Sequence, residues 1–305
     1  MTRETLELNI SPDPNNLIPE AGRYKETVQS VIDNQRSCGG GKLELDRSAI
    51  FRYPHDAQEV VSLVKEKLLS REKVSLLDIG VGNLEELSSY LAAIQVVASQ
   101  NHRTIKDCVN VEIVELRSAE AVQPNFNLGK EGGAFLPDDQ KKNAPAIKPP
   151  QEYTEAFVLD SEQGGYCFSQ EIQGYLKDIT NNPQIAHFFT SLEDYLGDSD
   201  GQSFDVVACN NVLQYLGGVG TFFLNPFTPP SFIKESPELY EEFFTVLKKI
   251  TKLVVPGGLL IIHVDKKGGD RRGENAKPIL ELLPGFSSEF VEIAPAIYKR
   301  NISKT

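Results

Sequence analysis

Residues 74–92 read VSLLDIGVGNLEELSSYLA, and this stretch determines how the rest of the chain is arranged. A short apolar run from Val74 to Ile79 is typical of a buried strand, and apolar residues at helical spacing follow from Leu84. Between them, Gly80 and Gly82 lack a Cβ, so the backbone can turn sharply and a ligand can lie against it. The stretch predicts a strand, a glycine turn and a helix, with a ligand site at the carboxyl edge of a sheet.

The chemistry of this turn favours a cationic ligand. A pyrophosphate-binding turn has a third glycine near position 85, whereas this chain has Glu85 and Glu86, whose carboxylates repel phosphate. The common cationic nucleoside cofactor is S-adenosylmethionine, and we expect Asp78, Gly80 and Gly82 to bind it. The alternative interpretation is a plain strand-to-helix turn with no ligand.

Size and charge limit the possible classes of protein. A chain of 305 residues with 40% hydrophobic and 24% charged residues is globular and long enough for one large α/β domain with a small appendage, or for two modest domains. The net charge of -12 disfavours nucleic acid or an anionic membrane as the main partner. We therefore expect neither as a partner.

The cysteines and the apolar runs indicate a cytoplasmic protein. The four cysteines are far apart and form no CxxC pair, so we predict neither a disulfide framework nor a zinc site. No apolar run has transmembrane length, and the first residues, MTRETLELNISPDPNN, lack the apolar core of a signal peptide.

Candidate binding residues follow three further strands. Glu115 ends a predicted strand over Val109 to Leu116, where an acid can accept hydrogen bonds from both ribose hydroxyls; a solvated strand-end acid is the alternative. Ser191 and Leu192 follow a third strand, predicted over 185–189, at the edge where adenine is commonly held.

The fourth strand, FDVVAC at 204–209, leads directly into Asn210 and Asn211. Their side-chain amides can bind either the cofactor or the acceptor substrate, or they can cap the next helix. The aromatic loop at 217–237 is either a lid over the acceptor or a packed surface loop. The cations of residues 266–272 either steer an acidic substrate or belong to a solvated loop.

The remaining pattern predicts a doubly wound α/β fold. We expect a turn at Pro54 and then an amphipathic helix within Ala49 to Leu69, and further helices from Tyr166 to Ile179 and from Leu239 to Val254. The pattern also predicts an insertion near 129–150, a turn at Pro256–Gly258 before a fifth strand that contains His263, and a last hairpin of 290–294 and 297–300.

Four features of the sequence occur in an order that resembles the class I S-adenosylmethionine-dependent methyltransferases. They are Leu77-Asp78-Ile-Gly80-Val-Gly82, strand-end Glu115, Phe204-Asp205-Val-Val and Pro256-Gly257-Gly258. The resemblance covers roughly residues 50–305. It implies a mostly parallel seven-stranded sheet with an antiparallel last hairpin, and S-adenosylmethionine as cofactor.

Within that class, FDVVACNNVLQYL at 204–216 is similar to the FDxIxCRNVLIYF segment of the chemotaxis-type (CheR-like) protein-glutamate methyltransferases. Phe51-Arg52 is similar to the FFR of that family. The resemblance implies that Arg52 and Tyr215 lie near the methyl-transfer centre and that Asn211 matches the asparagine in the RN pair of the family's motif. Asn210 stands where the family has an arginine.

These patterns predict an amino-terminal arm or small helical cap over 1–48 and a methyltransferase domain over 49–305, with insertions near 129–150 and 217–237. The expected activity is methyl transfer to a carboxylate, on a protein or a small molecule, or to another oxygen. The alternatives are a small-molecule O- or N-methyltransferase and a non-catalytic binding module with the same fold.

Overall fold

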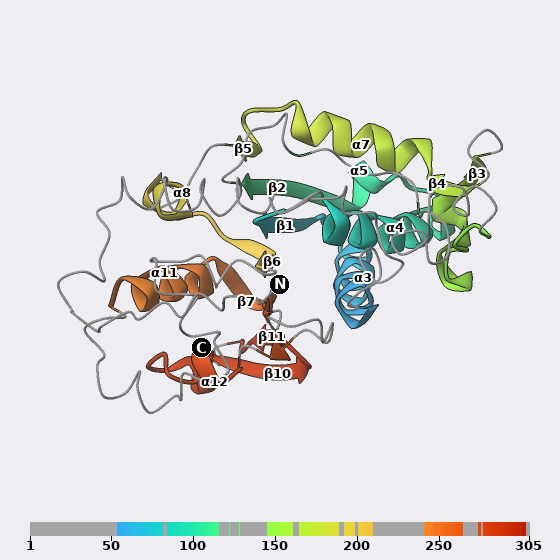
Figure 1. Ribbon diagram of the computed structural model, residues 1–305. Coiled ribbons are helices and arrows are strands. Elements are labelled where there is room, and N and C mark those ends of the chain that lie inside the picture. Colours follow the sequence, from blue (N-terminus) through green and yellow to red (C-terminus); the bar gives the residue numbers. More distant parts are fainter. Residues whose placement is uncertain are drawn as a thin grey trace, which may run out of the picture.

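The computed structural model describes residues 54–81, 84–115, 122, 128, 145–160, 165–188, 192–198, 201–209, 241–264, 274–275 and 277–302 (Figure 1). The helices of at least seven residues are α3 (Pro54–Leu69), α4 (Glu85–Gln100), α7 (Gln170–Thr180), α8 (Leu192–Asp198) and α11 (Glu241–Lys252). The short helices are α5 (Ile105–Cys108), the 3₁₀ helix η3 (Gln151–Ala156), α12 (Lys277–Leu280) and α13 (Phe286–Glu289).

Seven strands form the main sheet in the order β10-β11-β7-β6-β1-β2-β5, which Figure 1 shows from bottom to top. They are β1 (Val74–Ile79), β2 (Val109–Glu115), β5 (Ala186–Phe188), β6 (Phe204–Cys209), β7 (Val254–Ile261), β10 (Phe290–Ala294) and β11 (Ile297–Arg300). The strands from β7 to β5 pair in parallel, and β11 pairs antiparallel with both β7 and β10. This order confirms the predicted doubly wound α/β fold with an antiparallel last hairpin.

Helices cover both faces of the sheet, because the central strands are buried on both sides. On one face, Leu76, Ile113 and Val206 pack with α3, α4 and α7 in one hydrophobic core. On the other face, Leu77 and Val207 pack with α8, α11 and the short helices α12 and α13 in a second core. Side chains alternate along each strand, so neighbouring residues of β1 supply the two cores.

A small hairpin replaces part of a predicted helix. The strands β3 (Phe157–Asp160) and β4 (Gly165–Phe168) pair antiparallel, so the helical prediction for Tyr166 to Phe168 is wrong. Ser169 accepts a hydrogen bond from the backbone N–H of Ile172 at 3.3 Å and caps α7, which therefore begins only at Gln170.

The Pro256–Gly258 turn also differs from its prediction, because it lies inside β7. The pairing of β6 with β7 shifts register between Phe204 and Val206, and Gly257 has a φ of +84°. A Cβ on Gly258 would lie 2.8 Å from the carbonyl oxygen of Asp205, so the close approach of the two strands requires glycine there. The strand β7 ends at Ile261, and His263 opens the two-residue strand β8 (His263–Val264), which pairs with β9 (Glu274–Asn275).

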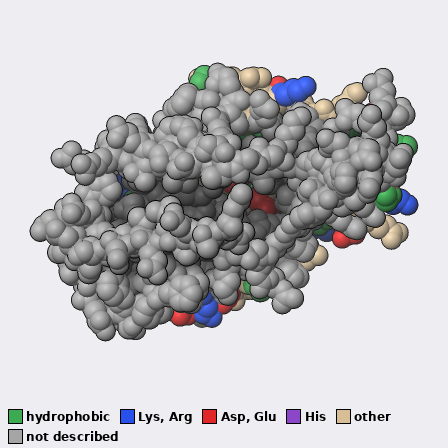
Figure 2. All heavy atoms as spheres, in the orientation of Figure 1, with side chains coloured by type: hydrophobic (Ala, Val, Ile, Leu, Met, Phe, Trp, Pro, Cys, Tyr) green, Lys and Arg blue, Asp and Glu red, His purple; other side chains and the backbone are tan. Residues whose placement is uncertain are grey.

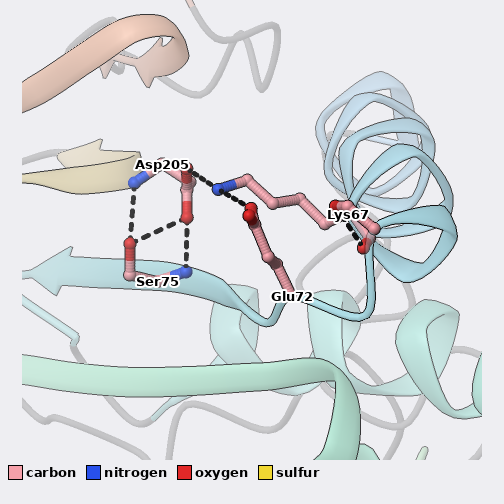
Figure 3. A network of polar contacts seen from close by, with 5 residues as sticks. Lys67, Glu72, Ser75 and Asp205 are labelled. Atoms are coloured by element: carbon pink, nitrogen blue, oxygen red, sulfur yellow. Dashed lines mark hydrogen bonds and ion pairs between the residues drawn. The ribbon is translucent and has the colours of Figure 1, made fainter.

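A network of polar contacts joins β1 and β6 at their amino ends (Figure 3). Oδ2 of Asp205 accepts hydrogen bonds from the backbone N–H of Ser75 at 2.8 Å and from its hydroxyl at 2.9 Å. Lys67, near the end of α3, places its Nζ 2.8 Å from Oδ1 of Asp205 and 3.3 Å from Oε2 of Glu72. The buried Asp205 of the FDVV motif therefore fixes helix α3 and two central strands to one another.

Several predicted segments lie outside the described residues: 1–48, 129–144, 217–237 and 266–272. In the part of the chain that the structure describes, no helix is long and apolar enough to cross a membrane.

We predict that Asp205→Ala lowers the free energy of unfolding by about 3 kcal/mol, because it leaves two Ser75 donors without their acceptor and removes the closer of the two acids that pair with the Lys67 ammonium. Urea titration measures the loss. As a control, Asp178→Ala removes an acid whose side chain is 61% exposed, and the expected loss there is below about 1 kcal/mol. Equal losses in the two variants would contradict the assigned role of Asp205.

Candidate functional site

The turn between β1 and α4 lies at the carboxyl edge of the sheet and is tied to β2. Gly80 has a φ of 70°, in the left-handed region that favours glycine, and its N–H donates to the carbonyl of Val114 at 2.8 Å. Leu84 also has a positive φ, of 62°, and its N–H donates to the carbonyl of Val81 at 2.7 Å. A positive φ is uncommon for a non-glycine residue, although Arg71, His102 and Ala296 share it elsewhere in the described chain.

Two buried carboxylates lie beside this turn. Asp78 pairs with Ile113 across the β1–β2 ladder, and Glu115 lies two residues further along β2. Because side chains alternate along a strand, Asp78 and Glu115 lie on the same face of the sheet, the face covered by α3 and α4. Asp78 is 2% exposed and Glu115 is 6% exposed. Oδ2 of Asp78 is buried and has no hydrogen-bond partner among the described residues.

This environment changes the acidity of Asp78. Burial, and to a smaller extent the negative charge of Glu115, raise the pKa of the Asp78 carboxyl to about 7. A buried carboxylate with an oxygen that accepts no hydrogen bond is unfavourable unless a cation or a proton neutralises it. The site is therefore suited to a ligand with positive charge and hydrogen-bond donors.

These residues fit S-adenosylmethionine, which carries a sulfonium, an ammonium and two ribose hydroxyls. Oδ2 of Asp78 can accept a hydrogen bond from the cationic portion of the cofactor or neutralise its charge. Glu115, at the end of β2, can accept hydrogen bonds from the ribose hydroxyls. Figure 2 shows acidic side chains of the described residues near the middle of the face viewed in Figure 1.

The structure brings together only part of the predicted site. Asp78, Gly80 and Glu115 meet at one edge of the sheet. Leu192 begins α8, and its side chain is buried in the core on the opposite face, with Tyr195 and Leu196. The other predicted site residues lie outside the described residues, and their roles stay predictions: Arg52, Gly82, Ser191, Asn210, Asn211 and Tyr215.

A buried acid–histidine pair, which the sequence pattern did not predict, lies on the same side of the sheet as Asp78. Nε2 of His263 lies 2.8 Å from Oδ2 and 3.0 Å from Oδ1 of Asp56, in the first turn of α3. The hydroxyl of Tyr90, on α4, donates to Oδ2 of Asp56 at 3.4 Å. The pair joins α3 and α4 to the chain just beyond β7. In the sequence, Asp56 suggests only a favourable acid at a helix start.

A second polar cluster lies on the opposite face of the sheet, where β2 pairs with β5. Oε1 of Glu112 is 2.7 Å from the hydroxyl of Tyr195 and 3.0 Å from Nε2 of His187. Burial and the neighbouring Glu112 raise the pKa of Tyr195, so this phenol stays a neutral donor. The cluster joins β2, β5 and α8. Within the described residues, no group of three or more His, Cys, Asp or Glu side chains is arranged to hold a metal ion.

Comparison with known proteins gives similarity in structure alone. No protein-family model matches the chain, and no curated protein matches its sequence. One similar solved structure is the N-methyltransferase NodS from Bradyrhizobium japonicum, at 11% identity and a TM-score of 0.32, covering 82% of this chain and 99% of that one. Another is an O-methyltransferase family protein from Burkholderia thailandensis, at 13% identity and a TM-score of 0.31, covering 92% and 72%. The calicheamicin methyltransferase CalS11 has 12% identity and a TM-score of 0.32, with 94% of each chain covered.

We predict that Asp78→Asn changes how stability depends on pH. Because the pKa of Asp78 is raised in the folded state, protonation of this carboxyl stabilises the fold. That contribution to the free energy of unfolding is fully present below about pH 4 and is lost as the pH rises through about 7. The free energy of unfolding of the variant, relative to the native protein, should therefore increase by on the order of 4 kcal/mol between pH 4 and pH 8.

Urea titrations across this range measure the difference. Glu152→Gln, which removes an exposed acid, serves as control and should show no such trend. A flat difference between Asp78→Asn and the native protein would show that Asp78 keeps an ordinary pKa.

Proposed function

We propose that this protein is an S-adenosylmethionine-dependent methyltransferase. The observation that carries the proposal is the pair of buried carboxylates, Asp78 and Glu115, at the carboxyl edge of β1 and β2 beside the Gly80 turn. In doubly wound sheets, ligands bind at this edge. The sheet order and the antiparallel last hairpin, which the resemblance to class I methyltransferases implies, support the proposal.

The protein would contribute binding and alignment to the reaction. When bound, S-adenosylmethionine supplies an electrophilic methyl group, whose bond to sulfur breaks as the acceptor forms its bond to carbon. Asp78 and Glu115 hold the charged and hydroxyl-bearing portions, and the Gly80 backbone leaves room beside them. The remaining tasks are to exclude water and to align the acceptor with the methyl carbon.

We further propose a carboxylate, or another readily ionised oxygen, as acceptor. Among the described histidines, His263 is 4% exposed with its Nε2 bonded to Asp56, and His187 has its Nε2 3.0 Å from Oε1 of Glu112, so the described residues show no exposed base beside Asp78 and Glu115. A carboxylate, with an ordinary pKa near 4, is already ionised at neutral pH and requires no base. Arg52 and Tyr215 are proposed to orient it.

Cofactor binding tests the proposed activity class. We expect the native protein to bind S-adenosylmethionine and S-adenosylhomocysteine in calorimetric titration. Glu115→Gln should weaken both roughly 10- to 100-fold, since a hydrogen bond to a charged group contributes about 1.5–3 kcal/mol. Glu152→Gln, an exposed glutamate change, should leave both affinities as in the native protein. No heat of binding for either ligand would reject the enzyme in favour of a non-catalytic module.

Methyl transfer tests the acceptor and the two proposed orienting residues. With a radiolabelled methyl group and panels of carboxylates, amines and phenols, we expect transfer to carboxylates. Tyr215→Phe and Arg52→Ala should each lower kcat/KM at least about tenfold, because each removes one alignment contact. Transfer only to amines or phenols would favour the small-molecule alternative. Unchanged activity in both variants, with cofactor binding retained, would exclude their assigned roles.

A further inference from the structure

We propose that Asp78 holds a proton in the free protein and releases it when the positive charge of the cofactor binds beside it. Cofactor affinity then depends on pH through one identified carboxyl group. This inference rests on the proposed function, since the cation in question is carried by S-adenosylmethionine. It assigns to Asp78 a role in selecting a charged ligand, in addition to shaping the site.

The first step of the argument is the burial of Asp78. Asp78 is the penultimate residue of the central strand β1, which lies between β2 and β6, and it is 2% exposed. Oδ2 is inaccessible to solvent and has no hydrogen-bond partner among the described residues. An ionised carboxylate there loses its hydration without gaining full compensation from the protein, so the neutral acid is favoured.

The second step is the charge around Asp78. Glu115, on β2, lies on the same face of the sheet and opposes a second negative charge. Cys209 ends β6, on the other side of Asp78, and burial raises the pKa of its thiol, so it remains neutral. Other titratable groups on described elements of this face include Glu86 and Tyr90 on α4, Asp56 on α3 and His263 on β8, and the same core contains Cys108, Tyr153 and Tyr175. The α3 helix also carries Glu59, Lys65, Glu66 and Lys67. His263 is hydrogen-bonded to Asp56, so the imidazole is directed at a different carboxylate.

The third step is the effect of a bound cation. A positive charge beside the buried carboxyl of Asp78 lowers its pKa, because opposite charges stabilise the ionised form. The raised pKa of Asp78, about 7, means that near-neutral pH divides the free protein between the protonated and ionised forms. Binding at pH 6 should therefore release about 0.9 proton, and binding at pH 8 about 0.1 proton.

The same exchange predicts the pH dependence of affinity. The dissociation constant should be about tenfold weaker at pH 6 than at pH 8, because at the lower pH the proton competes with the cofactor for Asp78. S-adenosylmethionine carries an ammonium and a sulfonium, whereas S-adenosylhomocysteine keeps only the ammonium. A larger proton release with the first ligand assigns the exchange to the sulfonium, and an equal release assigns it to the ammonium.

Calorimetric titration in pairs of buffers of equal pH but different ionisation enthalpy measures the protons released. The full-length native protein is titrated with each ligand at pH 6 and pH 8. In Asp78→Asn, which keeps the size of the side chain but does not titrate, the release at pH 6 should vanish and the tenfold change in affinity should disappear. Asp178→Asn, which changes an exposed aspartate on α7, should behave as the native protein does.

The outcomes separate the two proposals. Ligand binding with no proton release at pH 6, or with the same release in Asp78→Asn, overturns the exchange and leaves the proposed function intact. The native protein alone also decides the matter if the variant fails to fold, since an affinity that is equal at pH 6 and pH 8 overturns the exchange. Absence of binding of either ligand at both pH values rejects the methyltransferase proposal and the exchange with it.

Discussion

The parallel pairing of β1 with β2 and β6 is the constraint on which the rest of the structure depends. The strand β1 is central and buried on both faces, so its backbone groups must find their partners in the neighbouring strands. That pairing brings residues more than 100 positions apart into register, such as Leu77 and Val207. It also places the carboxyl ends of three strands at one edge, where loops are free to form a site.

The two ends of β1 are stabilised very differently. At the amino end, Asp205 accepts from the backbone N–H and hydroxyl of Ser75 and pairs with Lys67, so its charge is compensated. At the carboxyl end, Asp78 is equally buried, yet one of its oxygens accepts no hydrogen bond from the described residues. A well-satisfied end holds the strand in place, which allows the other end to carry a group whose preferred partner is a ligand.

The Asp56–His263 pair performs a related task just beyond β7, two strands away from β1 in the sheet. It links the start of α3 to the chain beyond β7, and Tyr90 adds a contact from α4. Removing one partner from such a buried pair leaves an uncompensated group, so the three elements are held together as a unit. The helix that leads into β1, the helix that follows the glycine turn and the chain after β7 thereby surround one edge of the sheet.

The sequence alone determined the main sheet and the centre of the candidate site. The apolar runs at 204–209, 290–294 and 297–300 are strands with the predicted bounds, because period and turn residues are local signals. Asp78, Gly80 and Glu115 lie at or just beyond the carboxyl ends of apolar runs in the sequence, and parallel pairing converts that position into proximity. Only the tertiary structure decided which acids are compensated. Asp205 and Asp78 look alike in the sequence, but their surroundings come from Ser75, Lys67 and Glu115, which lie far from them along the chain or on other strands, and only folding brings these charges and donors together.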